Sequence, residues 1–215
     1  VGHGIPAAQD MVQLRNGIGT ALVTFTGSGD FSLNAVANGL NASKPMASLA
    51  GVAQTNVSGT LAGASSSWSG VVHVTGDVTV PVGHTLTIQP GTLVLVDGTA
   101  TPLSTAGFDI IVAGRVNSLG SAVSPVTITA TNPAAPWGEI NHTSSQASLY
   151  QYTDITRGGH APRGGHTNTG PAIRTSGSTI TFDHSNITDV AGKTMQGSSS
   201  NLTFRDTIFS RSVMG

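Results

Sequence analysis

Two copies of Arg-Gly-Gly-His, at 157–160 and 163–166, concentrate basic side chains in one glycine-rich segment. Arginine offers paired donors that match a carboxylate. The candidates for binding an acidic polysaccharide, such as a uronate polymer, are Arg157, His160, Arg163 and His166. One alternative is a solvated loop whose glycines only permit the turn. Another is a metal site through the two histidines, which lack a third ligand nearby.

A second polar group recurs at a fixed interval near the C-terminus. Three pairs stand 22 positions apart: Asp183 with Arg205, His184 with Asp206, and Asp189 with Arg211. If these segments are stacked parallel strands, such residues lie about 4.8 Å apart. We therefore expect opposite charges to face each other on the surface. The alternative to a functional site is a charge ladder, which contributes little stability and limits aggregation at strand edges.

Apolar residues repeat at the same interval. Leu202, Phe204 and Phe209 follow Ile180, Phe182 and Ile187 by 22 positions. A third copy begins at Tyr150, 32 positions before Phe182, so ten residues are inserted in that turn. Fixed periods above about 20 residues indicate stacked units that bury their apolar faces against each other. We expect Tyr150, Phe182 and Phe204 to form one interior row. Tyr152, aligned with His184, should point outward, where it could stack on a ring.

The upstream segment Leu86-Thr-Ile-Gln-Pro-Gly-Thr-Leu-Val94 precedes these repeats, and its Pro90-Gly91 suits a type II turn. Together with the repeat spacing it resembles the right-handed parallel β-helix superfamily, the pectate-lyase-like fold, over roughly residues 68–215. The resemblance implies an all-β protein with a right-handed parallel β-helix of about six coils. It implies no single chemistry, because this fold carries lyases, hydrolases, adhesins and inert spacers.

The resemblance also suggests roles for the polar residues. In polysaccharide lyases of this fold, cations neutralise the uronate carboxylate while Lys, Arg or His removes the proton at C5. By that analogy His184, Arg205 and Lys193 would be catalytic. Tyr152 and Arg211 would join the inserted loop in substrate binding.

Carboxylates could serve this site in two further ways. Three of them would orient the catalytic groups or hold calcium: Asp183, Asp189 and Asp206. Glycoside hydrolysis needs a pair of carboxylates, for which Asp154 with Asp183 or Asp206 is the plausible source. The sequence contains no motif specific to a lyase or a hydrolase.

Composition narrows the classes of function. Only 9% of residues are charged, the net charge is −1, and nine Lys and Arg leave no electrostatic footprint for nucleic acid. Abundant Val, Thr and Ile favour a folded all-β chain. The chain has no cysteine, which excludes disulfides, and no apolar run near the ~20 residues of a membrane-spanning helix. We expect a secreted, bacterial, extracellular or cell-surface protein.

Two parts are expected along the chain. Residues 1–66 should form a β-rich N-terminal segment with a linker or cap, including strands at 21–26 and 31–36 joined by the turn 27–30. Residues 67–215 should form the β-helix. Its C-terminal end has no polar cap or closing helix, so we expect further chain or another chain to cover it.

Two functions remain open. The first is a secreted β-helix that binds, and in its enzymatic version cleaves, an acidic polysaccharide or cell-surface glycan as a lyase or glycoside hydrolase. The second is a non-catalytic structural or adhesive β-helix segment of a larger cell-surface protein. The inserted loop and the clustered polar residues favour the first, and the low charge with repeated coils favours the second.

Overall fold

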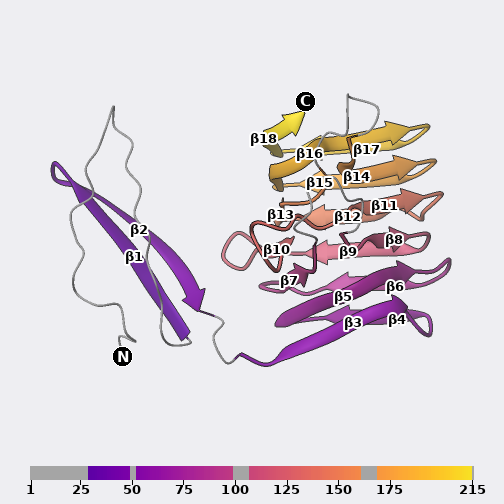
Figure 1. Ribbon diagram of the computed structural model, residues 1–215, viewed down its shortest axis with the longest axis horizontal. Helices are drawn as coiled ribbons and strands as arrows, with labels where there is room; N and C mark the ends of the chain where they lie inside the picture. The colour runs from indigo at the N-terminus through magenta and orange to yellow at the C-terminus, as the bar shows by residue number, and fades with distance from the viewer. Residues whose placement is uncertain (1–28, 49–51, 99–106, 161–168, 215) are drawn as a thin grey trace. The chain divides into compact units, whose positions relative to one another are not determined.

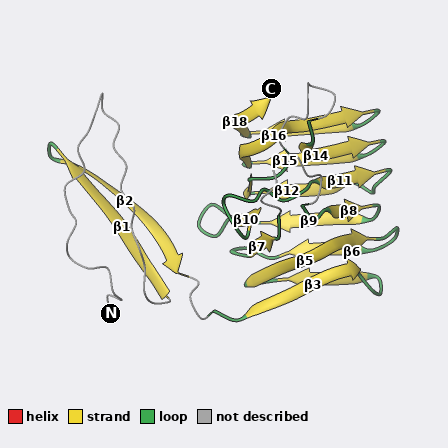
Figure 2. Ribbon diagram, viewed as in Figure 1, coloured by secondary structure: helices red, strands yellow, loops and turns green. Residues whose placement is uncertain are grey.

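The computed structural model describes residues 29–48, 52–98, 107–160 and 169–214, and all regular elements in these ranges are β-strands (Figure 2). Within them there is no helix long and apolar enough to cross a membrane. The chain divides into two compact units, Val1–Ala53 and Gln54–Gly215. Residues 54–68, just before the expected start of the β-helix at 67, contain strands that pair with the strands that follow.

The first unit contains a β-hairpin. Strand β1 (Gly29–Ala37) pairs antiparallel with β2 (Leu40–Ser48). Asn38 and Gly39 turn between them with φ of 49° and 79°, the two positive values of a type I′ turn. The expected strand at 31–36 lies inside β1, which pairs with the strand that follows it along the chain. The expected strand at 21–26 lies outside the described residues. Asn-Gly is the strongest short hairpin signal, and it decides the pairing.

The second unit is a stack of parallel strands (Figure 1). In chain order these are β3 (Gln54–Thr60), β4 (Ser65–Trp68), β5 (Val71–Val80), β6 (Thr85–Ile88), β7 (Leu93–Val96), β8 (Ile110–Val112), β9 (Arg115–Leu119), β10 (Val126–Ala130), β11 (Ile140–Thr143), β12 (Ser148–Gln151), β13 (Thr153–Thr156), β14 (Pro171–Ser176), β15 (Thr179–Asp183), β16 (Asn186–Ser198), β17 (Asn201–Arg205) and β18 (Ile208–Met214).

Each strand of this stack pairs with the strand that occupies the same position on the next circuit of the chain. One sheet has ten strands and the other six, in the order β17-β15-β12-β9-β6-β4. Long strands cover two positions of the larger sheet: the start of β5 pairs with β7 and its end with β8. The chain therefore passes through three strand positions per circuit, an arrangement like a parallel β-helix.

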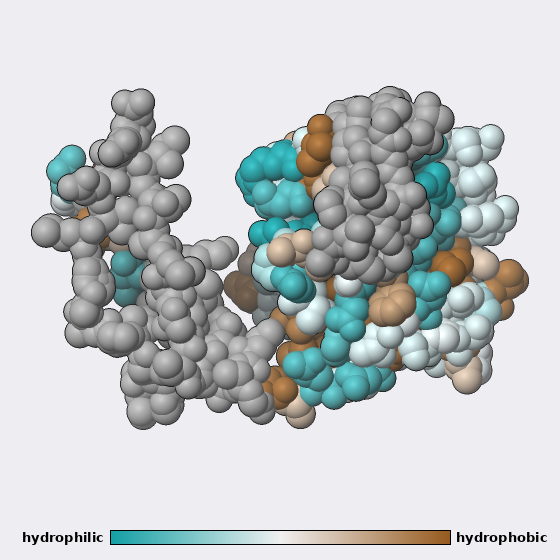
Figure 3. Space-filling model, viewed as in Figure 1, coloured by the Kyte–Doolittle hydropathy of each residue, from teal (hydrophilic) through white to brown (hydrophobic). Residues whose placement is uncertain are grey.

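The core is the interior of this stack, and one row of rings runs through it. Tyr150 lies in register with Phe182, and Phe182 with Phe204. Their ring centroids are 5.0 and 5.6 Å apart, so the expected interior row is confirmed. Tyr150 and Phe182 are 1% and 0% exposed, whereas Phe204 is 42% exposed at the end of the row. On the face seen in Figure 3, apolar side chains of this unit form only scattered patches between hydrophilic ones.

The corners between strand positions share one backbone geometry in the last three circuits. Three sets of residues have φ between 43° and 61°: Ser144, Gly177 and Ser199; Tyr152, His184 and Asp206; Arg157, Asp189 and Arg211. In the first two sets the next residue is Ser or Thr. The Ser178 hydroxyl accepts the Ser145 N–H at 3.0 Å, and the Ser185 hydroxyl accepts the Thr153 N–H at 3.1 Å. These internal bonds satisfy buried amides. The positive-φ residue before each Ser or Thr therefore directs its side chain outward, and equivalent residues of successive circuits are aligned.

Candidate functional site

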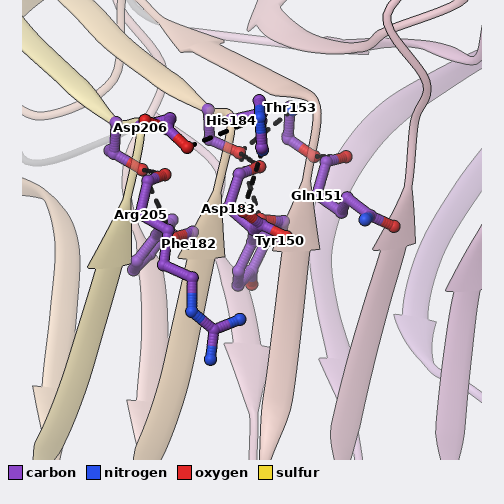
Figure 4. A network of polar contacts seen from close by, with 10 residues as sticks. Tyr150, Gln151, Thr153, Phe182, Asp183, His184, Arg205 and Asp206 are labelled. Atoms are coloured by element: carbon purple, nitrogen blue, oxygen red, sulfur yellow. Dashed lines mark hydrogen bonds and ion pairs between the residues drawn. The ribbon is translucent and has the colours of Figure 1, made fainter.

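The corner between β15 and β16 brings several predicted residues together. Gln151, Asp183 and Arg205 are in register at the ends of neighbouring strands. The residues after them, Tyr152, His184 and Asp206, turn with positive φ. We call Tyr152, Asp183, His184, Arg205 and Asp206 the histidine corner (Figure 4). Its alignment follows from the repeat spacing, as expected.

His184 is held by three neighbours. Its Nδ1 lies 2.9 Å from Asp183 Oδ1, and its Nε2 lies 3.5 Å from Asp206 Oδ2. The Tyr152 ring stacks on the imidazole with a centroid distance of 4.7 Å and an interplanar angle of 28°. Both nitrogens face carboxylates.

Arg205 does not make the contact that the spacing suggested. It lies in register with Asp183, but the Asp183 carboxylate bonds to His184 instead. Figure 4 shows the Arg205 side chain extending away from His184. In the part of the chain that the structure describes, no carboxylate pairs with its guanidinium. An exposed arginine with open donors can bind an external carboxylate.

Lys193 lies elsewhere. It is a buried residue within β16, not a residue of a loop. It is in register with Pro171, and its N–H donates to the Gly170 carbonyl at 3.2 Å. This position belongs to the next corner of the circuit. The structure therefore brings His184, which follows β15, next to Arg205 at the end of β17, whose carbonyl accepts the His184 N–H at 2.9 Å. It does not add Lys193 to them.

A second polar row occupies that next corner. Arg211 Nε and Nη2 donate to the two Asp189 carboxylate oxygens at 2.6 and 2.7 Å. The Arg211 hydrogen bond lowers the pKa of Asp189. Arg157 is nearby and donates from Nη1 to the Pro133 carbonyl at 3.0 Å. The predicted Asp189–Arg211 neighbours are confirmed, but the pair is exposed and adds little stability.

The Arg-Gly-Gly-His segment is described only at its base. Arg163 and His166 lie outside the described residues. His160 forms an antiparallel bridge with Gly170, which closes the two ends of the segment. Gly192 packs against the Gly170 carbonyl with no space for a Cβ. The backbone at this base is close-packed, and that explains its glycines.

A calcium site does not assemble from the three candidate carboxylates. Asp183 and Asp206 flank His184, whereas Asp189 pairs with Arg211. No group of three His, Asp or Glu side chains among the described residues could hold a metal ion.

Two titratable clusters lie outside the predicted sites. The first is a carboxylate ladder in which Asp77 accepts the Asp109 N–H at 3.0 Å and Asp109 accepts the Glu139 N–H at 2.8 Å. Arg174 Nε then donates to Glu139 Oε1 at 2.7 Å. Burial raises the pKa of Asp109 to about 6. The sequence signal is an acidic residue directly before an apolar one at three places: Asp77-Val78, Asp109-Ile110 and Glu139-Ile140.

The second cluster is inside the stack. His142 Nδ1 lies 2.9 Å from Ser145 Oγ, and His142 Nε2 lies 2.9 Å from the Tyr150 hydroxyl. Burial lowers the pKa of His142 to about 4 and raises that of Tyr150. All three side chains are buried. This network satisfies internal polar groups and has no exposed atom to offer a ligand.

Comparison of the chain with family models, with curated proteins and with solved structures finds no match.

Proposed function

We propose that residues 54–215 form a right-handed parallel β-helix of about six coils, similar to the pectate-lyase-like superfamily, and that its histidine corner binds an acidic polysaccharide outside the cell. The architecture is supported by the parallel registers and by the three strand positions per circuit. The binding function rests chiefly on one observation. Arg205 is in register with Asp183 on the neighbouring strand, and no carboxylate of the described residues pairs with its guanidinium.

Each group at the corner has a part in holding a uronate chain. Arg205 supplies a fork of donors for the sugar carboxylate. Asp206, with its side chain 74% exposed, accepts hydrogen bonds from ring hydroxyls. Tyr152 stacks on His184 with one ring face. An aromatic side chain of this kind can also pack against the apolar face of a sugar ring.

The geometry supports binding better than cleavage. A lyase needs a base within hydrogen-bond reach of the C5 proton. Lys193 is buried at another corner, and both nitrogens of His184 face carboxylates. In this proposal Arg205 binds the carboxylate of the sugar, and His184 holds the Tyr152 ring in place by stacking on it. We propose a non-enzymatic glycan-binding protein.

The test compares binding to polygalacturonate and alginate with binding to a neutral glucan of similar length. The wild type should bind the acidic polymers, and Arg205→Gln should weaken binding at least tenfold, since a charge-assisted bond contributes about 1.5–3 kcal/mol. Arg174→Gln is the matched control, because Arg174 pairs with Glu139 at a different corner. Equal binding by Arg205→Gln and wild type would refute the site. Unsaturated products detected by absorbance would refute the non-enzymatic assignment.

The second candidate function is a structural or adhesive segment of a larger cell-surface protein. Its support is the row of corner and core residues that continues without a break through the last three circuits. A rigid spacer needs this continuity and no ligand. Absence of binding to any acidic or neutral glycan, with full thermal stability, would favour this second function.

A further inference from the structure

The turn of the first unit, which joins β1 to β2 through Asn38 and Gly39, is open to solvent. Both residues are exposed, with φ of 49° and 79°. The backbone bond of a type I′ turn joins its first residue to its fourth, so it leaves the N–H of Gly39 without a partner in the turn. A Cβ added at Gly39 would meet no atom within 4 Å. The Gly39 nitrogen is therefore uncrowded, and it directly follows the Asn38 carboxamide in the chain.

Little buried surface holds this turn closed. Leu40, directly after it, is 76% exposed and lies in register with Ala37. Val36, in the next pair, is 73% exposed and lies in register with Asn41. Apolar side chains that stay in water contribute little hydrophobic stabilisation, and segments with few buried contacts open locally at a low free-energy cost. The turn can therefore open and rotate without unfolding the β-strand stack.

We propose that Asn38 is a modification site, at which the chain converts its own asparagine to aspartate and isoaspartate, and that the isoaspartate form unpairs β1 from β2. Water is the only co-reactant. The inference rests on the exposure and backbone geometry of the turn. It concerns the first unit of the chain and is independent of glycan binding at the histidine corner of the second.

The reaction has two steps. In the first, the Gly39 nitrogen gives its proton to hydroxide and attacks Asn38 Cγ, so that a C–N bond forms and the side-chain nitrogen leaves as ammonia. A succinimide ring remains, in which the Gly39 nitrogen is bonded to both carbonyl carbons of residue 38. In the second step water opens this ring. Cleavage of the bond from Cγ to nitrogen gives aspartate, and cleavage of the bond from the backbone carbonyl carbon to nitrogen gives isoaspartate.

The two products differ in their effect on the hairpin. Aspartate keeps the backbone unchanged, and Asp-Gly forms the same type I′ turn as Asn-Gly. Isoaspartate carries the main chain through its side-chain carbons, so the two-residue loop between Ala37 and Leu40 becomes one atom longer. Loop length and turn type fix the register of a hairpin, so this product should loosen the pairing of β1 with β2. Both products add a negative charge to a chain whose net charge is −1.

The test incubates the full chain at pH 8.0 and 37 °C and follows Asn38 by fragmentation mass spectrometry. Fragmentation is needed because the sequence has a second Asn-Gly pair, at Asn16. Conversion at Asn38 should be at least tenfold faster than at Asn117, because the residue after Asn117, Ser118, is buried within β9 and must first leave the sheet. Amide hydrogen exchange in β1 and β2 should become at least tenfold faster in the fraction that carries isoaspartate.

Two variants are matched controls. Asn38→Gly keeps a sequence that forms a type I′ turn and removes the carboxamide, so its exchange should stay constant during the incubation. Asn38→Asp should exchange like the fresh wild type, because only isoaspartate lengthens the loop.

Three outcomes would overturn the proposal. One is an unchanged Asn38 in the protein when a synthetic peptide of residues 34–43 converts, because the turn would then protect the side chain. Another is an equal rate of conversion at Asn38 and Asn117. The third is isoaspartate at Asn38 with no change of exchange in β1 and β2.

Discussion

His142 and Tyr150 are joined by a hydrogen bond of 2.9 Å between Nε2 and the phenol oxygen, inside the strand stack. The two rings also meet edge to face at 5.9 Å. Tyr150 in turn stacks on Phe182, so a titratable imidazole is tied to the aromatic row of the core. The stability of this core should therefore depend on pH.

Acidification should destabilise the protein through His142. Burial lowers its pKa to about 4 from the ordinary value of 6.5, so the unfolded chain binds more protons between these values. The stabilisation is complete above pH 6.5 and is lost as the pH falls toward 4. A shift of this size corresponds to roughly 3 kcal/mol. Urea denaturation at pH 7.5, 6.0, 5.0 and 4.0 measures it. His142→Gln, which can still bond to Tyr150, should flatten the profile, and an unchanged slope would contradict the assignment.

Asp109 should make the protein less stable as the pH rises, which is the opposite of the effect of His142, over an overlapping pH range. Burial raises its pKa to about 6 from 3.8, so the folded protein binds more protons in this window and stability falls as the pH rises through it. Asp109→Asn removes the buried charge and keeps an acceptor for the Glu139 N–H. We expect a gain at pH 7.5 of no more than about 2 kcal/mol after solvent screening. The variant should also lose stability more steeply on acidification, because the effect of His142 is no longer offset. If Asp109→Asn were less stable than the wild type at pH 7.5, the buried charge of Asp109 would not be destabilising and the assignment would be wrong.

Truncating a ring of the aromatic row should lower the free energy of unfolding, and the loss should be smaller at the exposed end of the row. Phe182→Ala removes a ring covered on both sides and should cost about 3–5 kcal/mol. Phe204→Ala removes a ring covered on one side, and should cost less than half as much because water already reaches it. Chemical denaturation of the two variants gives the comparison. Equal losses would mean that Phe204 is buried in solution.

Ser185 should matter for both the fold and the site. Its hydroxyl donates toward the Tyr150 and Asp183 carbonyls, each at 3.1 Å, and accepts the Thr153 N–H. Ser185→Ala leaves buried backbone groups unsatisfied and should cost about 1–3 kcal/mol. Since Ser185 follows His184, the variant should also weaken glycan binding. Ser185→Thr keeps the hydroxyl, as Thr153 and Thr207 do at the same corner, and should restore both properties.

Much of the fold could be predicted because the sequence repeat is regular in the last circuits, which carry the aligned residues. The interval between Phe182 and Phe204 led to the register between their strands, and the outward position of Tyr152 followed from its alignment with His184. The strand β3 was missed because its residues are mostly exposed and polar, so no apolar alternation marks it. The pairing of β1 with β2 follows from Asn38-Gly39, whose two positive φ values make a type I′ turn.

The sequence alone determined which residues come into line, because a fixed interval in stacked parallel strands places equivalent residues one strand apart. Only the tertiary structure decided what those aligned side chains do. Asp183 bonds to His184 and leaves Arg205 open, and Lys193 is buried in β16. Side-chain direction and burial depend on corner geometry and on neighbours from other circuits, and neither is encoded in the spacing.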